Sequence, residues 1–266
     1  MCCPFRTGYE QDKREEIEKL MEDWKAVIKT KAPMVFPDDK KKYPTIDYFN
    51  SDGFFPGYFS SDSKRILFIG RESRYCSGKD RILSDLEWFK NGSVNTSAYW
   101  RRILYITYGI QMQGKVEFDD VPYAKDILNE MIKRNKYGFA IMNISKYSND
   151  EEYGRTANYE QINRFLIDTE LSKRNFIREE IEILDPEIII TANLWNGKID
   201  ETELEKIFPT ADCSNYDFYK DKKNIANMWD FDLNEKKVKL IDLYHFSCIG
   251  SDRNYFYDPV MSLLYP

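Results

Sequence analysis

Four short apolar runs punctuate the chain, and each has the length and composition of a buried β-strand. The first three are almost continuously apolar, which is typical of strands that are covered on both faces. The fourth alternates more and predicts one wetter face. The four predicted strands are Arg65–Gly70, Phe139–Ile144, Glu187–Thr191 and Lys237–Leu243.

The segments between these runs repeat their apolar residues at helical spacing. The last of them stops before Asp185 and Pro186, where proline interrupts a helix. Strands that alternate with helices favour an α/β fold with a parallel sheet. We therefore predict a three-layer α/β/α sandwich around a four-stranded, mainly parallel central sheet. The predicted helices are 79–90, 97–110, 123–135 and 172–184.

Residues 1–64 predict an N-terminal extension packed on an α/β domain of residues 65–266. Its charged helix, Asp12 to Lys29, carries one apolar stripe, and we expect this stripe to pack on the domain, with a partner helix as the alternative. The aromatic segment from Pro33 to Ser63 predicts an ordered loop. The stripe consists of Ile17, Leu20, Met21, Trp24 and Val27.

The charge balance argues against a protein that binds nucleic acid through overall attraction. The net charge is -6 and the hydrophobic fraction 42%, so tight nonspecific binding to DNA is not expected, although a local basic groove remains compatible with these values. No run approaches the ~18 apolar residues of a membrane span, and the first residues carry no apolar signal segment. We expect a cytoplasmic protein without a membrane segment.

The cysteines and the single histidine argue against a structural zinc site. Five cysteines are widely spaced, no Cys-x-x-Cys pair occurs, and only one histidine is present. This pattern predicts reduced thiols and no structural zinc. We also expect no metal cluster and no cofactor. The cysteines are Cys2, Cys3, Cys76, Cys213 and Cys248.

A polar side chain stands at the end of each predicted strand. Glu72 follows the first strand, Asn143 ends the second, Thr191 and Asn193 follow the third, and His245 follows the last. In open α/β sheets, ligands collect outside the carboxyl ends of the strands. Histidine is also the side chain whose unperturbed pKa lies nearest neutrality. The sequence therefore predicts one pocket that holds a carboxylate, an amide and an imidazole.

The order of four motifs resembles the uracil-DNA glycosylase superfamily over residues 65–250. The motifs are Gly70-Arg-Glu-Ser73, Asn143-Ile-Ser-Lys146, the segment 176–192 with its Asp-Pro link, and Tyr244-His-Phe-Ser247. The resemblance implies that fold, a role in DNA repair and hydrolysis of the N-glycosidic bond of a flipped base.

The resemblance also implies roles for single residues. Glu72 falls where some members have the aspartate that activates water, and Asn143 resembles the asparagine that hydrogen-bonds the flipped base. His245 and Ser247 resemble a His-Pro-Ser motif whose histidine stabilises the departing base, with Phe246 in place of the proline. Gly70 resembles a glycine that lets backbone approach the ligand.

Further candidates follow from side-chain chemistry. Tyr75 is a candidate for stacking on the base, as are Phe54, Phe55 and Trp100. Arg71, Arg74 and Lys146 are candidates for phosphate contacts, since guanidinium and ammonium groups suit phosphate oxygens.

Three functions stay open at this point. The first is a DNA glycosylase-like hydrolase that acts on a flipped, possibly modified, or free base. The second is a non-catalytic protein that binds a nucleotide or nucleic acid through the same pocket. The third is an unrelated hydrolase of small nucleosides. All three predict DNA, a nucleotide or a nucleobase as the ligand.

Overall fold

The four predicted strands lie side by side in the computed structural model. They are β2 (Ile66–Gly70), β3 (Ala140–Asn143), β4 (Ile188–Ala192) and β7 (Lys236–Leu243), and they run parallel in the order β3-β2-β4-β7. The structure describes residues 8–31, 46–74, 76–149, 157–209, 216–220 and 223–266. The α/β class and the parallel core predicted from the apolar runs are confirmed.

The sheet is larger than predicted, because it has seven strands and is mixed rather than four-stranded. At one edge, β1 (Gly53–Phe54) pairs antiparallel with β3. At the other edge, β6 (Lys223–Leu233) pairs antiparallel with β7, and β5 (Tyr216–Lys220) pairs with β6. Asn234 and Glu235 join β6 to β7 with φ values of 50° and 66°, the left-handed conformation of a tight hairpin turn.

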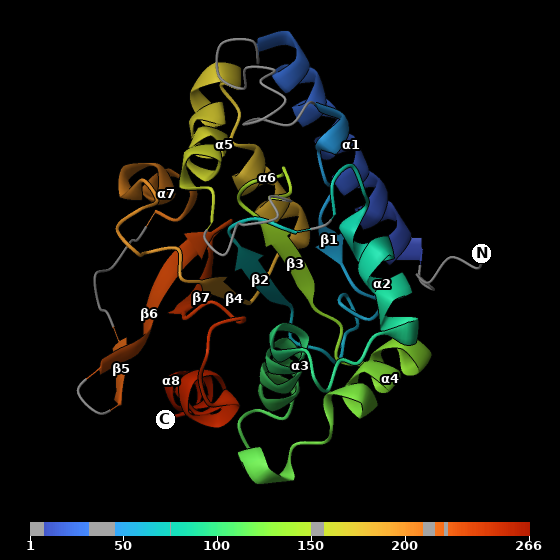
Figure 1. Cartoon of the computed structure of the whole chain (residues 1–266), viewed down its shortest axis with the longest axis vertical. Coiled ribbons are helices and arrows are strands. Elements are labelled where there is room, and N and C mark those ends of the chain that lie inside the picture. Colours follow the sequence, from blue (N-terminus) through green and yellow to red (C-terminus); the bar gives the residue numbers. More distant parts are fainter. Residues whose placement is uncertain (1–7, 32–45, 75, 150–156, 210–215, 221–222) are drawn as a thin grey trace.

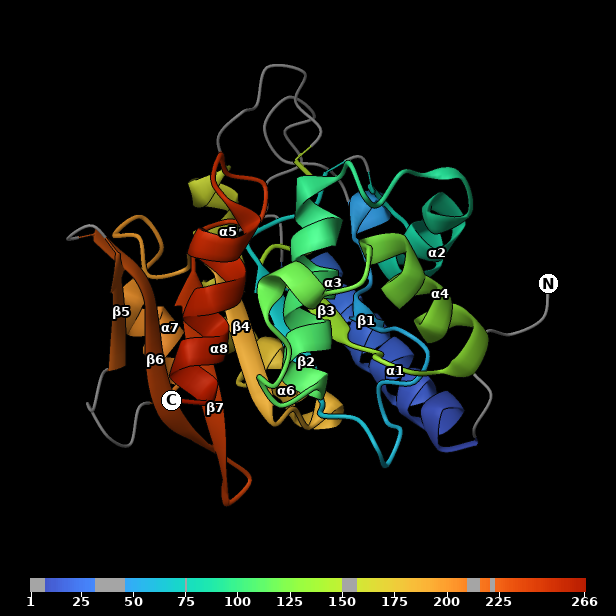
Figure 2. The ribbon, with the colours of Figure 1, turned by 90° about the horizontal axis from the view of Figure 1, so that it is seen from below.

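Helices cover both faces of this sheet. In Figure 1, α1, α5, α6 and α7 lie on one side of the strands, and α3, α4 and α8 lie on the other. Figure 2, seen from below, places α3, α4 and α8 in front of the strands. The helices are α1 (Gly8–Lys31), α2 (Arg81–Asn91), α3 (Ala98–Gln111), α4 (Ala124–Arg134), α5 (Tyr159–Ser172), α6 (Phe176–Leu184), α7 (Glu201–Ile207) and α8 (Asp258–Leu264).

The segment before residue 65 shares its core with the rest of the chain. The apolar stripe of α1 is buried, and the Trp24 ring stacks on Phe176 of α6 with 5.3 Å between ring centroids. Ile28 takes the last buried position of the stripe, where Val27 was predicted, and Val27 is partly buried. Among the helices described, none is long and apolar enough to cross a membrane.

The strand order makes the carboxyl end of β2 the candidate position for a ligand site. The chain leaves β2 for β3 on one side and then returns past β2 to β4 on the other side. Ligands of open α/β sheets bind at such a switch point, because the loops diverge there and leave a crevice.

Candidate functional site

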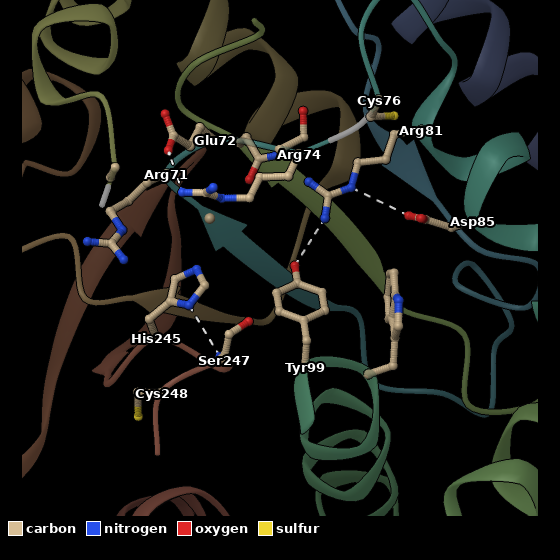
Figure 3. Close-up of a pocket in the computed structure, with 15 residues that line it drawn as sticks. Arg71, Glu72, Arg74, Cys76, Arg81, Asp85, Tyr99, His245, Ser247 and Cys248 are labelled. Carbon is tan, nitrogen blue, oxygen red and sulfur yellow. Dashed lines mark hydrogen bonds and ion pairs between the residues drawn. The ribbon is translucent and has the colours of Figure 1, made fainter. Parts of the chain in front are cut away.

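A cavity of about 640 Å³ lies at this switch point, within the roughly 300–1,000 Å³ range of small-molecule sites. The loops after β2, β3 and β7 line it together with the first turns of α2 and α3 (Figure 3). Its lining residues are Gly70, Arg71, Glu72, Ser73, Arg74, Cys76, Arg81, Asp85, Tyr99, Trp100, Asn143, Ala157, His245, Ser247 and Cys248.

Most of the predicted site residues therefore meet at one cavity. Two do not: Tyr75 lies outside the described residues, and Lys146 is buried elsewhere. Of the other stacking candidates, Trp100 lines the cavity, while Phe54 and Phe55 are buried in the core. The predicted residues that line it are Gly70, Arg71, Glu72, Arg74, Asn143, His245 and Ser247.

Gly70 and Asn143 lie side by side in the lining of the cavity. They are paired across β2 and β3, and a Cβ atom on Gly70 would lie only 2.3 Å from Asn143 Oδ1. The Asn143 backbone N–H donates to Asp52 Oδ2 over 2.7 Å. The absent side chain at Gly70 therefore gives the amide of Asn143 its position.

Glu72 is a carboxylate held from two sides. Asn149 Nδ2 donates to Oε1 over 2.8 Å, and the Asn158 backbone N–H donates to Oε2 over 3.1 Å. Arg74 Nη2 lies 4.0 Å from Oε1, and the Glu72 side chain is 5% exposed. Burial raises the pKa of Glu72 against these hydrogen bonds, which brings the carboxylate closer to the range of a general base at neutral pH.

His245 is held as a neutral imidazole. Burial, followed by the positive charges of Arg71, Arg74 and Arg81, lowers its pKa to about 4. The Ser247 backbone N–H donates to Nδ1 over 3.2 Å. Because a neutral imidazole has one N–H and Nδ1 accepts, the proton resides on Nε2, which becomes a hydrogen-bond donor.

The loop that carries His245 is fixed by Phe246 and Arg102. The Phe246 ring is buried, 5.6 Å from the ring of Phe68. Arg102 of α3 is 3% exposed, and its Nη atoms donate to the carbonyl oxygens of Phe246, Cys248 and Gly250 over 2.5, 2.8 and 2.7 Å. Sequence reasoning missed Arg102, although an arginine within an otherwise apolar helix face was an available signal.

The predicted phosphate contact of Lys146 is wrong. Its side chain is fully buried, and Nζ donates to Asp52 Oδ2 over 2.7 Å and to Glu180 Oε2 over 2.6 Å. Burial raises the pKa of Glu180 to about 7, although Lys146 opposes this shift. A lysine enclosed by two carboxylates compensates their charge inside the core and is out of reach of a phosphate in the cavity.

Sequence reasoning also missed a polar cluster at the first turns of α2 and α3. Arg81 donates from Nη2 to Tyr99 Oη over 3.1 Å and from Nε to Asp85 Oδ2 over 3.4 Å. Burial raises the pKa of Asp85 to about 6. The available signal was Asp80, which caps α2 by accepting from the Leu83 N–H over 2.9 Å. A capping residue marks the start of a helix, and helices that follow such strands begin at the ligand-binding edge of the sheet.

The cavity differs in charge from the whole chain. Three arginines and two carboxyl groups line it, and burial raises the pKa of both carboxyl groups, so an anionic group is favoured there. Burial also raises the pKa of the Cys76 thiol to about 11, which makes it a poor nucleophile. Within the part of the chain that the structure describes, no cluster of three metal-ligating side chains occurs.

Comparison with models of protein families, with curated proteins and with solved structures gives no match. The function of the site is therefore argued from its own geometry and chemistry.

Proposed function

We propose that this protein hydrolyses the N-glycosidic bond of a nucleotide whose base, flipped from DNA or free, enters the cavity. The observation that carries the proposal is the meeting of three side chains from three strand ends. Glu72, Asn143 and His245 line one cavity, as a buried carboxylate, an amide and a neutral imidazole. These are the groups that cleavage of such a bond requires.

In the proposed reaction, the bond between C1′ of the sugar and the base nitrogen breaks, and the base leaves with both electrons. The N–H at His245 Nε2 donates to an acceptor atom of the base, a carbonyl oxygen or a ring nitrogen, and stabilises the developing anion. Water attacks C1′, and its proton passes to the Glu72 carboxylate. Asn143 binds the edge of the base, because an amide offers both a donor and an acceptor. The departing base anion takes up a proton from water, and Glu72 returns its proton to solvent, so the products are the free base and an abasic sugar.

The arginines beside Glu72 supply a place for a phosphate of the ligand. Arg71 Nη1 donates to Tyr159 Oη over 2.6 Å, and its Nε is buried without a hydrogen-bond partner among the described residues. Arg74 is exposed at the same side of the cavity. Guanidinium groups bind phosphate oxygens in a bidentate way, so a DNA phosphate or a nucleotide phosphate fits here.

The test is cleavage of a panel of base-modified oligonucleotides, single- and double-stranded, and of the matching free nucleotides. Free base is measured by chromatography, and abasic sites by alkaline strand scission. We expect activity on at least one substrate and a loss of about 100-fold or more in His245→Ala and in Glu72→Gln. The exposed variant Arg134→Gln is the matched control and should keep full activity.

A panel that yields no free base with wild-type protein would overturn the hydrolase proposal. One observation favours the alternative, a protein that binds a nucleotide without cleaving it. Both carboxylate oxygens of Glu72 already accept hydrogen bonds, so the group has a structural task whether or not it activates water. Nucleotide binding by calorimetry without release of base would establish this second function.

A further inference from the structure

The cavity has two ends with different chemistry. At one end lie Glu72, Arg71 and His245, to which the proposed function assigns the sugar, the phosphate and the leaving group. At the other end lie Arg81, Tyr99 and Asp85 (Figure 3). The proposed function leaves this second end without a role, although it contains the buried guanidinium of Arg81.

Arg81 has one hydrogen-bond donor that the protein leaves unused. The residue is 8% exposed, and its Nε and Nη2 donate to Asp85 and Tyr99. Nη1 is buried and has no hydrogen-bond partner within the described part of the chain. In Figure 3 the guanidinium projects from α2 toward the middle of the cavity. A buried guanidinium N–H without an acceptor is costly, and a ligand that supplies the acceptor removes this cost.

Tyr99 offers a second donor beside it. Its Oη accepts from Arg81 Nη2, so the phenolic proton is free to be donated, and no acceptor for it is found among the residues described. The ring of Tyr99 packs against Trp100, with 5.0 Å between centroids and an interplanar angle of 88°. Both aromatic rings line the cavity, so this end combines two donors with apolar surface.

Asp85 acts on the ligand only through Arg81. Its carboxylate accepts from Nε, which fixes the plane of the guanidinium and leaves the Nη edge directed away from α2. Asp85 is therefore a positioning residue, and Arg81 and Tyr99 are the residues that would touch a ligand.

We infer that the Arg81–Tyr99 end of the cavity selects a base by its acceptor edge, and that the base is a 6-oxopurine, as in guanine and hypoxanthine. The inference rests on the proposed function in one respect, that the cavity holds a nucleobase. O6 and N7 of a 6-oxopurine are adjacent acceptors, and arginine commonly reads them with two donors. Here Arg81 Nη1 and the Tyr99 hydroxyl supply the two donors. A 6-aminopurine presents its own N–H donors at the same place and leaves the Arg81 donor unsatisfied.

Calorimetric binding tests this selectivity without requiring cleavage. The probes are guanosine, inosine and adenosine 5′-monophosphates and ribose 5-phosphate. We expect the two 6-oxopurine nucleotides to bind wild-type protein at least about tenfold more tightly than the adenine nucleotide, because one bidentate pair discriminates roughly 5- to 150-fold. Arg81→Gln should bring this ratio close to one, Tyr99→Phe should reduce it in part, and the exposed control Arg134→Gln should leave it unchanged.

Several outcomes would overturn the inference. The first is that the adenine nucleotide binds as tightly as the guanine nucleotide, and the second is that no nucleotide binds. The third is that Arg81→Gln weakens the binding of ribose 5-phosphate as much as that of the nucleotides, which would make Arg81 a phosphate ligand. If Arg81→Gln fails to fold, as judged by circular dichroism, Tyr99→Phe decides, and full selectivity in that variant would also overturn it. Selective binding without release of base would sustain the inference and refute the hydrolase proposal, so the two failures are distinguishable.

Discussion

The single histidine of the chain allows the electrostatics of the cavity to be measured directly. His245 has a pKa lowered from the ordinary value of 6.5 to about 4. At about 1.4 kcal/mol for each pKa unit, the difference corresponds to about 3 kcal/mol in favour of the neutral ring in the folded protein. Burial contributes most, and the cations Arg71, Arg74 and Arg81 add to it.

The lowered pKa fixes how stability depends on pH. Between about pH 6.5 and pH 4, His245 is protonated in the unfolded chain but stays neutral in the folded protein. Protonation therefore favours unfolding in this window. The contribution of His245 to the free energy of unfolding is full above pH 6.5 and is lost as the pH falls toward 4. We expect wild-type protein to lose up to about 3 kcal/mol relative to His245→Asn across this window.

Nuclear magnetic resonance of untagged protein gives the test, because a single imidazole needs no assignment. At about pH 5.5 an ordinary histidine is about 90% protonated, whereas a group with a pKa of about 4 is about 3% protonated. The ¹⁵N shifts should show the proton on Nε2, since Nδ1 accepts from the Ser247 N–H. Arg71→Gln should raise the pKa, and Arg134→Gln should not. A pKa within one unit of 6.5, or a proton on Nδ1, would refute the reasoning.

Three further substitutions test the supports of the site. Lys146→Met should lower the free energy of unfolding, measured by urea denaturation, by about 3–5 kcal/mol, because it leaves two buried carboxylates without their cation. This loss should be smaller at pH 5 than at pH 8, since protonation of Glu180 relieves the repulsion between the carboxylates. Gly70→Ala should weaken nucleotide binding, measured by calorimetry, because its Cβ would displace the amide of Asn143. Arg102→Met should speed hydrogen exchange of the amides in residues 246–252, because three loop carbonyls lose their donor.

Exposed positions supply matched controls for these three variants. Lys90 is 61% exposed in its side chain, so Lys90→Met should change stability by less than about 0.5 kcal/mol. A Cβ on Gly8 meets nothing within 4 Å, and Gly8→Ala should leave binding intact. Arg134→Met should not change exchange in the 246–252 loop. The supports would be misassigned if Lys146→Met cost less than about 1 kcal/mol, or if either of the other variants matched its control.

The central strands were predictable because their signal is local. A run such as Ile66 to Ile69 is buried on both faces, so its apolarity is continuous and needs no partner to be recognised. The hairpin of β5 and β6 was missed for the opposite reason. β6 has one wetter face, and its Asn224, Asn227 and Asp230 lower the β-propensity of the segment. Pairing with β7 outweighs this propensity, and pairing is a long-range property.

The site was predictable only as far as strand ends determine it. Glu72, Asn143 and His245 follow strands, and the rule that strand ends converge placed them together. Lys146 follows a strand by the same logic, yet its two carboxylate partners come from residues 94 and 34 positions away. Such distant partners cannot be recognised from the spacing of residues in the sequence. A lysine that faces the core and one that faces solvent therefore look alike in the sequence.

Asp52 shows why the segment before residue 65 belongs to the site. One oxygen, Oδ2, accepts both from the Asn143 backbone N–H and from Lys146 Nζ. The same segment supplies β1, which pairs with β3 at Ala140 and Ile141. The strand that presents Asn143 to the cavity is thus held on its outer edge by pairing with β1 and at its end by the Asp52 carboxylate, both from outside the region of motif resemblance. The position of the Asn143 amide is therefore set by contacts that the motifs do not contain, and an account of the cavity confined to the motifs would omit its cause.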